Sequence, residues 1–133
     1  MPTALVIEDE VWIAGEIEEC LQRLGFDPVL LANSGQKALD YLRDEDRKRI
    51  DLITLDLKLP DGPQGGDVLE AVPEDRSIKV IICSAHDPVK FIDDDNIYRK
   101  ATATIQKPFS QEQLQSIVLA ILPELTPDFY PTG

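Results

Sequence analysis

The fold of this chain is decided by the stretch Asp51-Leu52-Ile53-Thr54-Leu55-Asp56-Leu57-Lys58-Leu59-Pro60-Asp61-Gly62. Its first half is a mostly apolar run with the length of a buried strand, and Pro60 and Gly62 mark the loop that follows. The strand therefore delivers one carboxylate, Asp56, to the start of a loop. Taken alone, Asp56 is as consistent with a polar cap as with a nucleophile. The choice depends on which other side chains reach the same edge of the sheet.

Length and composition predict one ordinary folded domain. The 133 residues suffice for a sizeable core without disulfide bonds or metals. Hydrophobic residues make up 43% and charged residues 29% of the chain, which excludes a disordered or fibrous class. The formal net charge of -12 argues against nucleic acid as a partner, because binding to phosphates needs a basic face. It argues equally against an anionic membrane surface.

The cysteines and the start of the chain predict a cytoplasmic protein. Cys20 and Cys83 lie far apart, with no Cys or His at metal-ligand spacing, so we expect reduced, apolar side chains. A strand-like run follows Met1-Pro2 directly, without a basic leader or a long apolar segment. We therefore expect neither an export signal nor a membrane span.

Hydrophobic periodicity alternates between strand and helix patterns along the chain. Gly25 is a stop signal for a first helix, Ser34 predicts the N-cap of a second, and Ser110 with Gln113 has the pattern of a capping box. The expected strands are residues 3–7, 26–32, the Asp56 strand, 78–83 and 101–106. The first expected helix ends near residue 24, the second runs from 34 to about 49, and the third runs from about 67 to 71. The last expected helix starts at residue 110 and turns five side chains toward the core: Leu114, Ile117, Val118, Ile121 and Leu122. Within residues 87–100 we expect only a helical turn, which the run Asp93-Asp94-Asp95-Asn96 would fray.

Strands that alternate with helices predict an α/β fold with a doubly wound, five-stranded parallel sheet covered by helices on both faces. We expect the strand order 2-1-3-4-5 in a domain spanning residues 1–122, followed by an extended tail at 123–133. The crevice of this order lies between the first and third strands. Glu8, Asp9 and Asp56 flank it, and Ser84 and Lys107 follow the neighbouring strands.

These five polar residues suggest phosphoryl transfer. Three carboxylates this close need a cation, and an oxygen-only ligand set suits Mg²⁺. A divalent cation with the Lys107 ammonium would attract a phosphoryl group, and the Ser84 hydroxyl could donate to it. In that reading Asp56 is the nucleophile and forms an aspartyl phosphate.

Four motifs together resemble the receiver domain of two-component response regulators, over residues 3 to about 122. They are Val6-Ile7-Glu8-Asp9-Glu10, Leu55-Asp56-Leu57-Lys58-Leu59-Pro60-Asp61-Gly62, Cys83-Ser84-Ala85 and Gln106-Lys107-Pro108-Phe109. The resemblance implies a flavodoxin-like receiver fold and a phosphoacceptor rather than a turnover enzyme. It implies that a histidine kinase or a histidine phosphotransfer protein phosphorylates Asp56.

The same resemblance implies a role for each site residue. Asp9, Asp56 and the main-chain carbonyl of Lys58 would bind Mg²⁺ directly, and Glu8 would bind it through water. Ser84 and Lys107 would contact the phosphoryl oxygens. No effector domain is expected after residue 122, so the output of this stand-alone domain would be a contact with a downstream protein.

Three positions depart from the family pattern. Thr104 stands where the family usually has an aromatic residue three positions before the lysine. The loop from Pro60 to Asp67 is one residue longer than is common. The fourth helix of the family pattern would lie within residues 87–100, where the sequence gives it little support. This affects the expected output surface more than the phosphorylation.

Three other functions compete with the receiver interpretation. A flavodoxin-type cofactor binder shares the topology, but the acidic run at 8–10 would repel the cofactor phosphate. A phosphatase with an Asp nucleophile needs a second acid two residues on, where Lys58 stands. A receiver-like scaffold or adaptor that acts independently of phosphorylation remains the competing interpretation.

Overall fold

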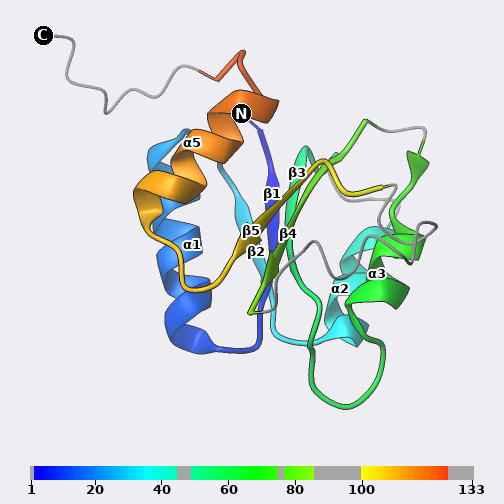
Figure 1. The fold of residues 1–133 in the computed structure, drawn as a ribbon. Coiled ribbons are helices and arrows are strands. Elements are labelled where there is room, and N and C mark those ends of the chain that lie inside the picture. Colours follow the sequence, from blue (N-terminus) through cyan, green and yellow to red (C-terminus); the bar gives the residue numbers. More distant parts are fainter. Residues whose placement is uncertain (1, 45–48, 75–76, 86–99, 126–133) are drawn as a thin grey trace, which may run out of the picture.

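A computed structural model describes residues 2–44, 49–74, 77–85 and 100–125. In these residues the chain forms five strands and four helices (Figure 1). They are β1 (Ala4–Ile7), α1 (Val11–Arg23), β2 (Val29–Ala32), α2 (Gly35–Arg43), β3 (Leu52–Asp56), α3 (Gly65–Ala71), β4 (Lys79–Ser84), β5 (Ala103–Gln106) and α5 (Gln111–Ile121). The helical turn expected within 87–100 and most of the tail expected at 123–133 lie outside the described residues.

The sheet has the predicted topology. All neighbouring strands pair in parallel, in the order β2-β1-β3-β4-β5. Helices α1 and α5 cover one face of the sheet, and α2 and α3 cover the other (Figure 1). The expected doubly wound α/β fold is therefore confirmed.

Each face of the sheet has its own hydrophobic core. Alternate residues of the central strands point to opposite faces, so β3 contributes Leu52 to the core under α1 and α5 and Ile53 to the core under α2 and α3. Cys20 and Cys83 are free and buried in the first of these cores, as expected. Burial raises the pKa of Cys20 to about 11 and that of Cys83 to about 12, so both thiols stay protonated at neutral pH.

Local signals predicted several helix ends. Gly25 follows α1 with a φ of 101°, a conformation that glycine adopts at little cost. Ser110 accepts a hydrogen bond from the N–H of Gln113, whose side chain accepts one from the N–H of Ser110. Of the residues expected to face the core from α5, Leu114, Val118 and Leu122 are buried, and Ile117 and Ile121 pack against them with partial exposure.

Two predicted boundaries were wrong because the backbone conformation at these positions differs from the one that the sequence pattern predicts. Helix α2 ends at Arg43 rather than near residue 49, since Asp44 is already extended. Strand β2 begins at Val29 rather than at Phe26. The N–H of Phe26 donates to the carbonyl of Leu21, so this residue continues the end of α1 instead of pairing with β1.

Smaller shifts occur at other ends. Strand β1 begins at Ala4 rather than at residue 3, and β4 spans Lys79–Ser84 rather than 78–83. Strand β5 begins at Ala103 rather than at residue 101, and α3 begins at Gly65 rather than near residue 67. None of these shifts changes which face of the sheet a side chain reaches.

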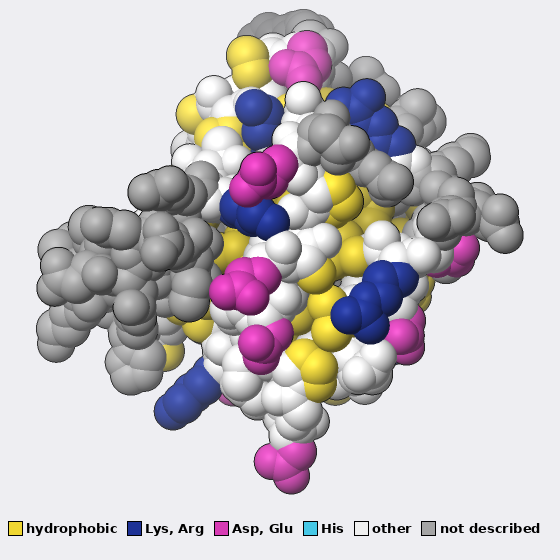
Figure 2. Space-filling view, turned by 90° about the vertical axis from the view of Figure 1, so that its right-hand side faces the viewer, with side chains coloured by type: hydrophobic (Ala, Val, Ile, Leu, Met, Phe, Trp, Pro, Cys, Tyr) yellow, Lys and Arg dark blue, Asp and Glu magenta, His cyan; other side chains and the backbone are white. Residues whose placement is uncertain are grey.

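The face of the molecule that carries α2 and α3 has a mixed surface. Lys and Arg side chains there are separated from one another by acidic, neutral and hydrophobic ones (Figure 2). No helix in the described part of the chain is long and apolar enough to cross a membrane.

We expect the central strands to dominate stability. Leu5 in β1 is fully buried, so Leu5→Ala should lower the free energy of unfolding by about 2–5 kcal/mol. Leu31 in the edge strand β2 is 36% exposed, so Leu31→Ala should cost about 1 kcal/mol or less. Urea unfolding of both variants measures the difference, and equal losses would contradict this assignment of the core.

Candidate functional site

The carboxyl ends of four parallel strands bring the predicted site residues to one edge of the sheet. Glu8 follows β1, Asp56 ends β3, Ser84 ends β4 and Lys107 follows β5. The N–H of Lys107 donates to the carbonyl of Ser84 at 2.7 Å, which holds the loop after β5 against β4. Ser84 is itself buried. Residues from distant parts of the sequence therefore meet because of the strand order.

Glu8, Asp9 and Asp56 form an acidic cluster. One carboxylate oxygen from each lies within 4.8 Å of the others. Glu8 and Asp56 are buried, whereas Asp9 is exposed. The cluster thus combines two desolvated acids with one that is open to solvent. Its oxygen atoms are the donors that Mg²⁺ prefers, so the residues present fit that ion.

Lys107 joins the two buried acids. Its ammonium forms an ion pair with Glu8 and a second one with Asp56, with 3.2 Å between Lys107 Nζ and Asp56 Oδ2. Its side chain is only 14% exposed. The ammonium reaches these acids across β4, which lies between β3 and β5 in the sheet. The site therefore already contains a cation at the place where a phosphoryl group would bring more negative charge.

Burial shifts the protonation of this cluster. The pKa of Glu8 is raised from its usual 4.5 to about 7, mainly by desolvation and also by the nearby Asp56, against the opposing effect of Lys107. Desolvation alone would lower the pKa of Lys107. The hydrogen bond and ion pair with Glu8, aided by Asp56, outweigh that effect, and the net pKa of Lys107 is raised. Lys107 therefore remains charged at neutral pH.

The segment after Asp56 also orients its carboxylate. The N–H of Lys58 donates to Asp56 Oδ1 at 3.1 Å, while the Lys58 side chain is exposed. Thr104, at the position where an aromatic residue is common in the family, lies exposed on β5 opposite Ile82 of β4.

Sequence reasoning missed the glycines that support this segment. A Cβ atom on Gly65 would lie 2.6 Å from Leu57 Cα and 2.8 Å from the carbonyl oxygen of Asp56. A Cβ atom on Gly35, the first residue of α2, would lie 2.0 Å from the carbonyl oxygen of Pro63. The Gly65-Gly66 pair was a possible signal of such close backbone approach.

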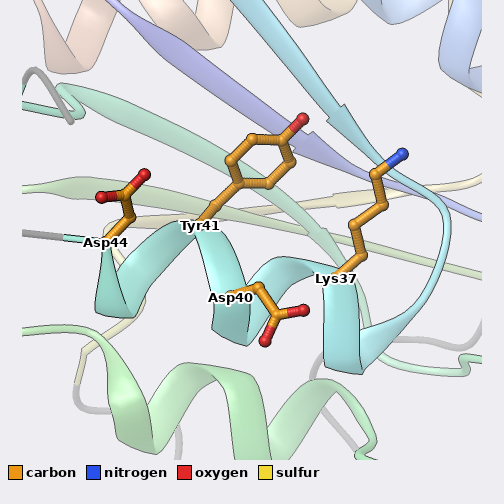
Figure 3. A pocket seen from close by; sticks show the side chains of 4 residues that line it. All are labelled: Lys37, Asp40, Tyr41 and Asp44. Carbon is orange, nitrogen blue, oxygen red and sulfur yellow. The ribbon is translucent and has the colours of Figure 1, made fainter. Parts of the chain in front are cut away.

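A pocket of about 180 Å³ lies elsewhere, on α2 (Figure 3). Lys37, Asp40, Tyr41 and Asp44 line it. In Figure 3 the side chains of Lys37 and Tyr41 point toward the strands, whereas Asp40 points away from them, and Asp40 accepts a hydrogen bond from Gln36. These groups do not converge on one point, so this pocket lacks the geometry of the acidic cluster.

Comparison with known proteins gives a family for this chain. The family model described as the response regulator receiver domain matches residues 4–119. Sporulation initiation phosphotransferase F of Bacillus subtilis is 30% identical over 90% of this chain and 92% of its own length. Chemotaxis protein CheY of Listeria monocytogenes is 26% identical over 83% of this chain and 89% of its own length.

Other relatives are longer than this chain. The uncharacterized transcriptional regulatory protein YrkP of Bacillus subtilis is 29% identical over 92% of this chain, which spans 50% of the YrkP length. The chain likewise spans 51% of the sensory transduction protein RegX3 of Mycobacterium tuberculosis, to which it is 28% identical.

Two solved structures illustrate the similarity in fold. A response regulator receiver protein from Sinorhizobium medicae superposes with a TM-score of 0.77 at 25% identity, over 92% of this chain and 94% of that one. The receiver domain of a sensor histidine kinase from Pseudomonas aeruginosa superposes with a TM-score of 0.70 at 25% identity, over 92% and 98%. That second structure has a magnesium ion coordinated in its active site cleft.

In metal-free protein, we expect Glu8 to make stability fall as the pH rises from about 4.5 to 7. In this range the folded protein holds a proton on Glu8 that the unfolded chain has released, because the folded pKa is the higher one. The contribution of Glu8 to the free energy of unfolding is fully present below pH 4.5. As the pH rises through 7, on the order of 3 kcal/mol of it is lost. Urea unfolding in the presence of a chelator, at several pH values, measures it.

The control is Glu8→Gln, which cannot titrate. Its stability should change less with pH over the same range. Parallel pH profiles for the two proteins would show that Glu8 is not the source of the dependence.

Proposed function

Because the chain belongs to the family of response regulator receiver domains, we propose that it accepts a phosphoryl group on Asp56 from a phosphohistidine. The donor is a histidine kinase or a histidine phosphotransfer protein. A carboxylate oxygen of Asp56 forms a bond to phosphorus as the bond between phosphorus and the imidazole nitrogen of the donor breaks. The imidazole then takes up a proton from solvent, and the product is an aspartyl phosphate.

The observation that carries this proposal is the placement of Asp56. Its carboxylate is buried, has carboxylate oxygens of Glu8 and Asp9 within 4.8 Å, and has the Lys107 ammonium 3.2 Å away. A structural cap needs none of these neighbours. Phosphoryl transfer depends mainly on positioning and charge neutralisation, and this cluster provides both.

Glu8, Asp9, Asp56 and the main-chain carbonyl of Lys58 would hold Mg²⁺. When bound, this ion neutralises charge on the phosphoryl oxygens as they approach the carboxylates. The exposed Asp9 leaves the cluster open on the solvent side, where a phosphodonor would enter. The receiver domain from Pseudomonas aeruginosa, with its magnesium ion in the active site cleft, supports this assignment.

Lys107 and Ser84 complete the site by contacting the transferred group. The Lys107 ammonium already pairs with Asp56 and can exchange that contact for a phosphoryl oxygen. The Ser84 hydroxyl, at the end of the neighbouring strand β4, donates to another. The protein is thus a phosphoacceptor and not a turnover enzyme.

For the output, we propose a stand-alone cytoplasmic response regulator that signals through a phosphorylation-dependent contact with a downstream protein. The similarity to phosphotransferase F and CheY over 92% and 89% of their lengths supports this interpretation. A receiver-like scaffold is the competing function. Thr104 favours it, because a threonine has no ring to change position when the site is phosphorylated.

Phosphorylation of Asp56 can be tested directly. Protein incubated with Mg²⁺ and acetyl phosphate should gain one phosphoryl group by intact mass, and chelation of the metal should abolish the gain. Asp56→Asn should gain none, because an amide is not a nucleophile at this position. Asp61→Asn, an exposed acid in the adjacent loop, is the matched control and should behave like the wild type.

Absence of an Asp56-dependent adduct with acetyl phosphate and with a broad panel of histidine kinases would refute the phosphoacceptor. An adduct that forms without any change in amide chemical shifts outside the site would instead favour the scaffold.

A further inference from the structure

The side chain of Gln64 closes the loop that follows the phosphoacceptor strand. Its Oε1 accepts a hydrogen bond from the N–H of Leu59 at 3.1 Å. Its Nε2 donates to the carbonyl of Pro60 at 3.2 Å and to that of Gly62 at 3.1 Å. One amide side chain thus satisfies three main-chain groups of a single turn, a set that needs an acceptor and a donor together.

This turn is connected directly to Asp56. The N–H of Gly65 donates to the carbonyl of Leu57 at 3.1 Å, and the Gly65 backbone lies close against the carbonyl of Asp56. Between these anchors, the N–H of Lys58 donates to Asp56 Oδ1. The Asp56 carboxylate is therefore oriented by a segment whose far end, at Leu59, is held by Gln64.

Gln64 and Asp67 form a capping box at the start of α3, but capping alone does not account for the position of the Gln64 side chain. The main-chain N–H of Gln64 donates to Asp67 Oδ2 at 2.9 Å, so Asp67 supplies the cap contact at this end of the helix. The Gln64 side chain also turns back to the loop, where it makes three hydrogen bonds to main-chain groups. A change at Asp67 removes its half of the capping box and leaves the loop contacts of Gln64 in place, so it separates capping of α3 from closure of the loop.

We propose that Gln64 is a positioning residue for the phosphoacceptor site. By fixing Leu59, Pro60 and Gly62, it holds the backbone of residues 57–59 in the conformation that presents the Lys58 carbonyl and the Asp56 carboxylate to a divalent cation. This inference rests on the proposed function and adds to it the residue that sets the affinity of the site for Mg²⁺.

The test compares Gln64→Ala and Gln64→Met with Asp67→Ala and with Gln36→Ala, a surface glutamine bonded within its own helix. Isothermal titration calorimetry gives the Mg²⁺ dissociation constant of each protein, and urea unfolding gives its stability. Gln64→Met keeps the side-chain length and most of the volume, so it separates loss of the hydrogen bonds from loss of packing.

Both Gln64 variants should raise the Mg²⁺ dissociation constant about tenfold, as is common when a supporting contact of a metal ligand is removed. Phosphorylation by acetyl phosphate should slow at low Mg²⁺ and approach the wild-type rate at saturating Mg²⁺. Asp67→Ala should lose stability with its dissociation constant within about twofold of the wild type, and Gln36→Ala should resemble the wild type in both.

A second readout needs no metal. Amide hydrogen exchange at Leu59 should be faster in Gln64→Met than in the wild type, because the N–H loses its acceptor.

The outcomes separate this inference from the function it rests on. If the wild type binds Mg²⁺ and is phosphorylated while both Gln64 variants match it, or if Asp67→Ala weakens binding as much as they do, the role of Gln64 is refuted alone. If the wild type neither binds Mg²⁺ nor gains a phosphoryl group, the proposed function fails and the role of Gln64 fails with it.

Discussion

The ion pairs of Lys107 with Glu8 and Asp56 are the interaction on which the site depends. Two buried carboxylates repel each other and lose hydration, and one shared ammonium offsets part of both costs. Lys107 reaches them only because β5 lies beyond β4 in the sheet and its loop is bonded to Ser84. The order of the strands is therefore a condition for the charge balance at their carboxyl ends.

The topology and the meeting of the site residues could be predicted from the sequence, because both follow from the periodicity and from polar residues placed where strands end. The ends of α2 and β2 could not, since Asp44 is already extended within a charged run and the N–H of Phe26 bonds to Leu21 at the end of α1. Gln64 escaped prediction for a different reason. Its partners are main-chain groups, which leave no residue-type pattern in the sequence.

Only a few residues separate Lys107, which pairs with the buried acids, from the start of α5. Residues 107–110 lead from the Lys107 ammonium to the start of α5. There Gln111 accepts hydrogen bonds from Cys20 and Arg23 of α1. The loop that carries Lys107 is therefore continuous in sequence with the contact between α1 and α5.

The contact between Gly35 and Pro63 links two positions that are far apart in the sequence. Any side chain at position 35 would collide with main-chain atoms of the loop, which cannot move aside as a flexible side chain could. A larger residue at 35 becomes acceptable only when the loop takes a different path. The two positions are thus epistatic: the first residue of α2 can gain a side chain only together with a change in the path of the loop.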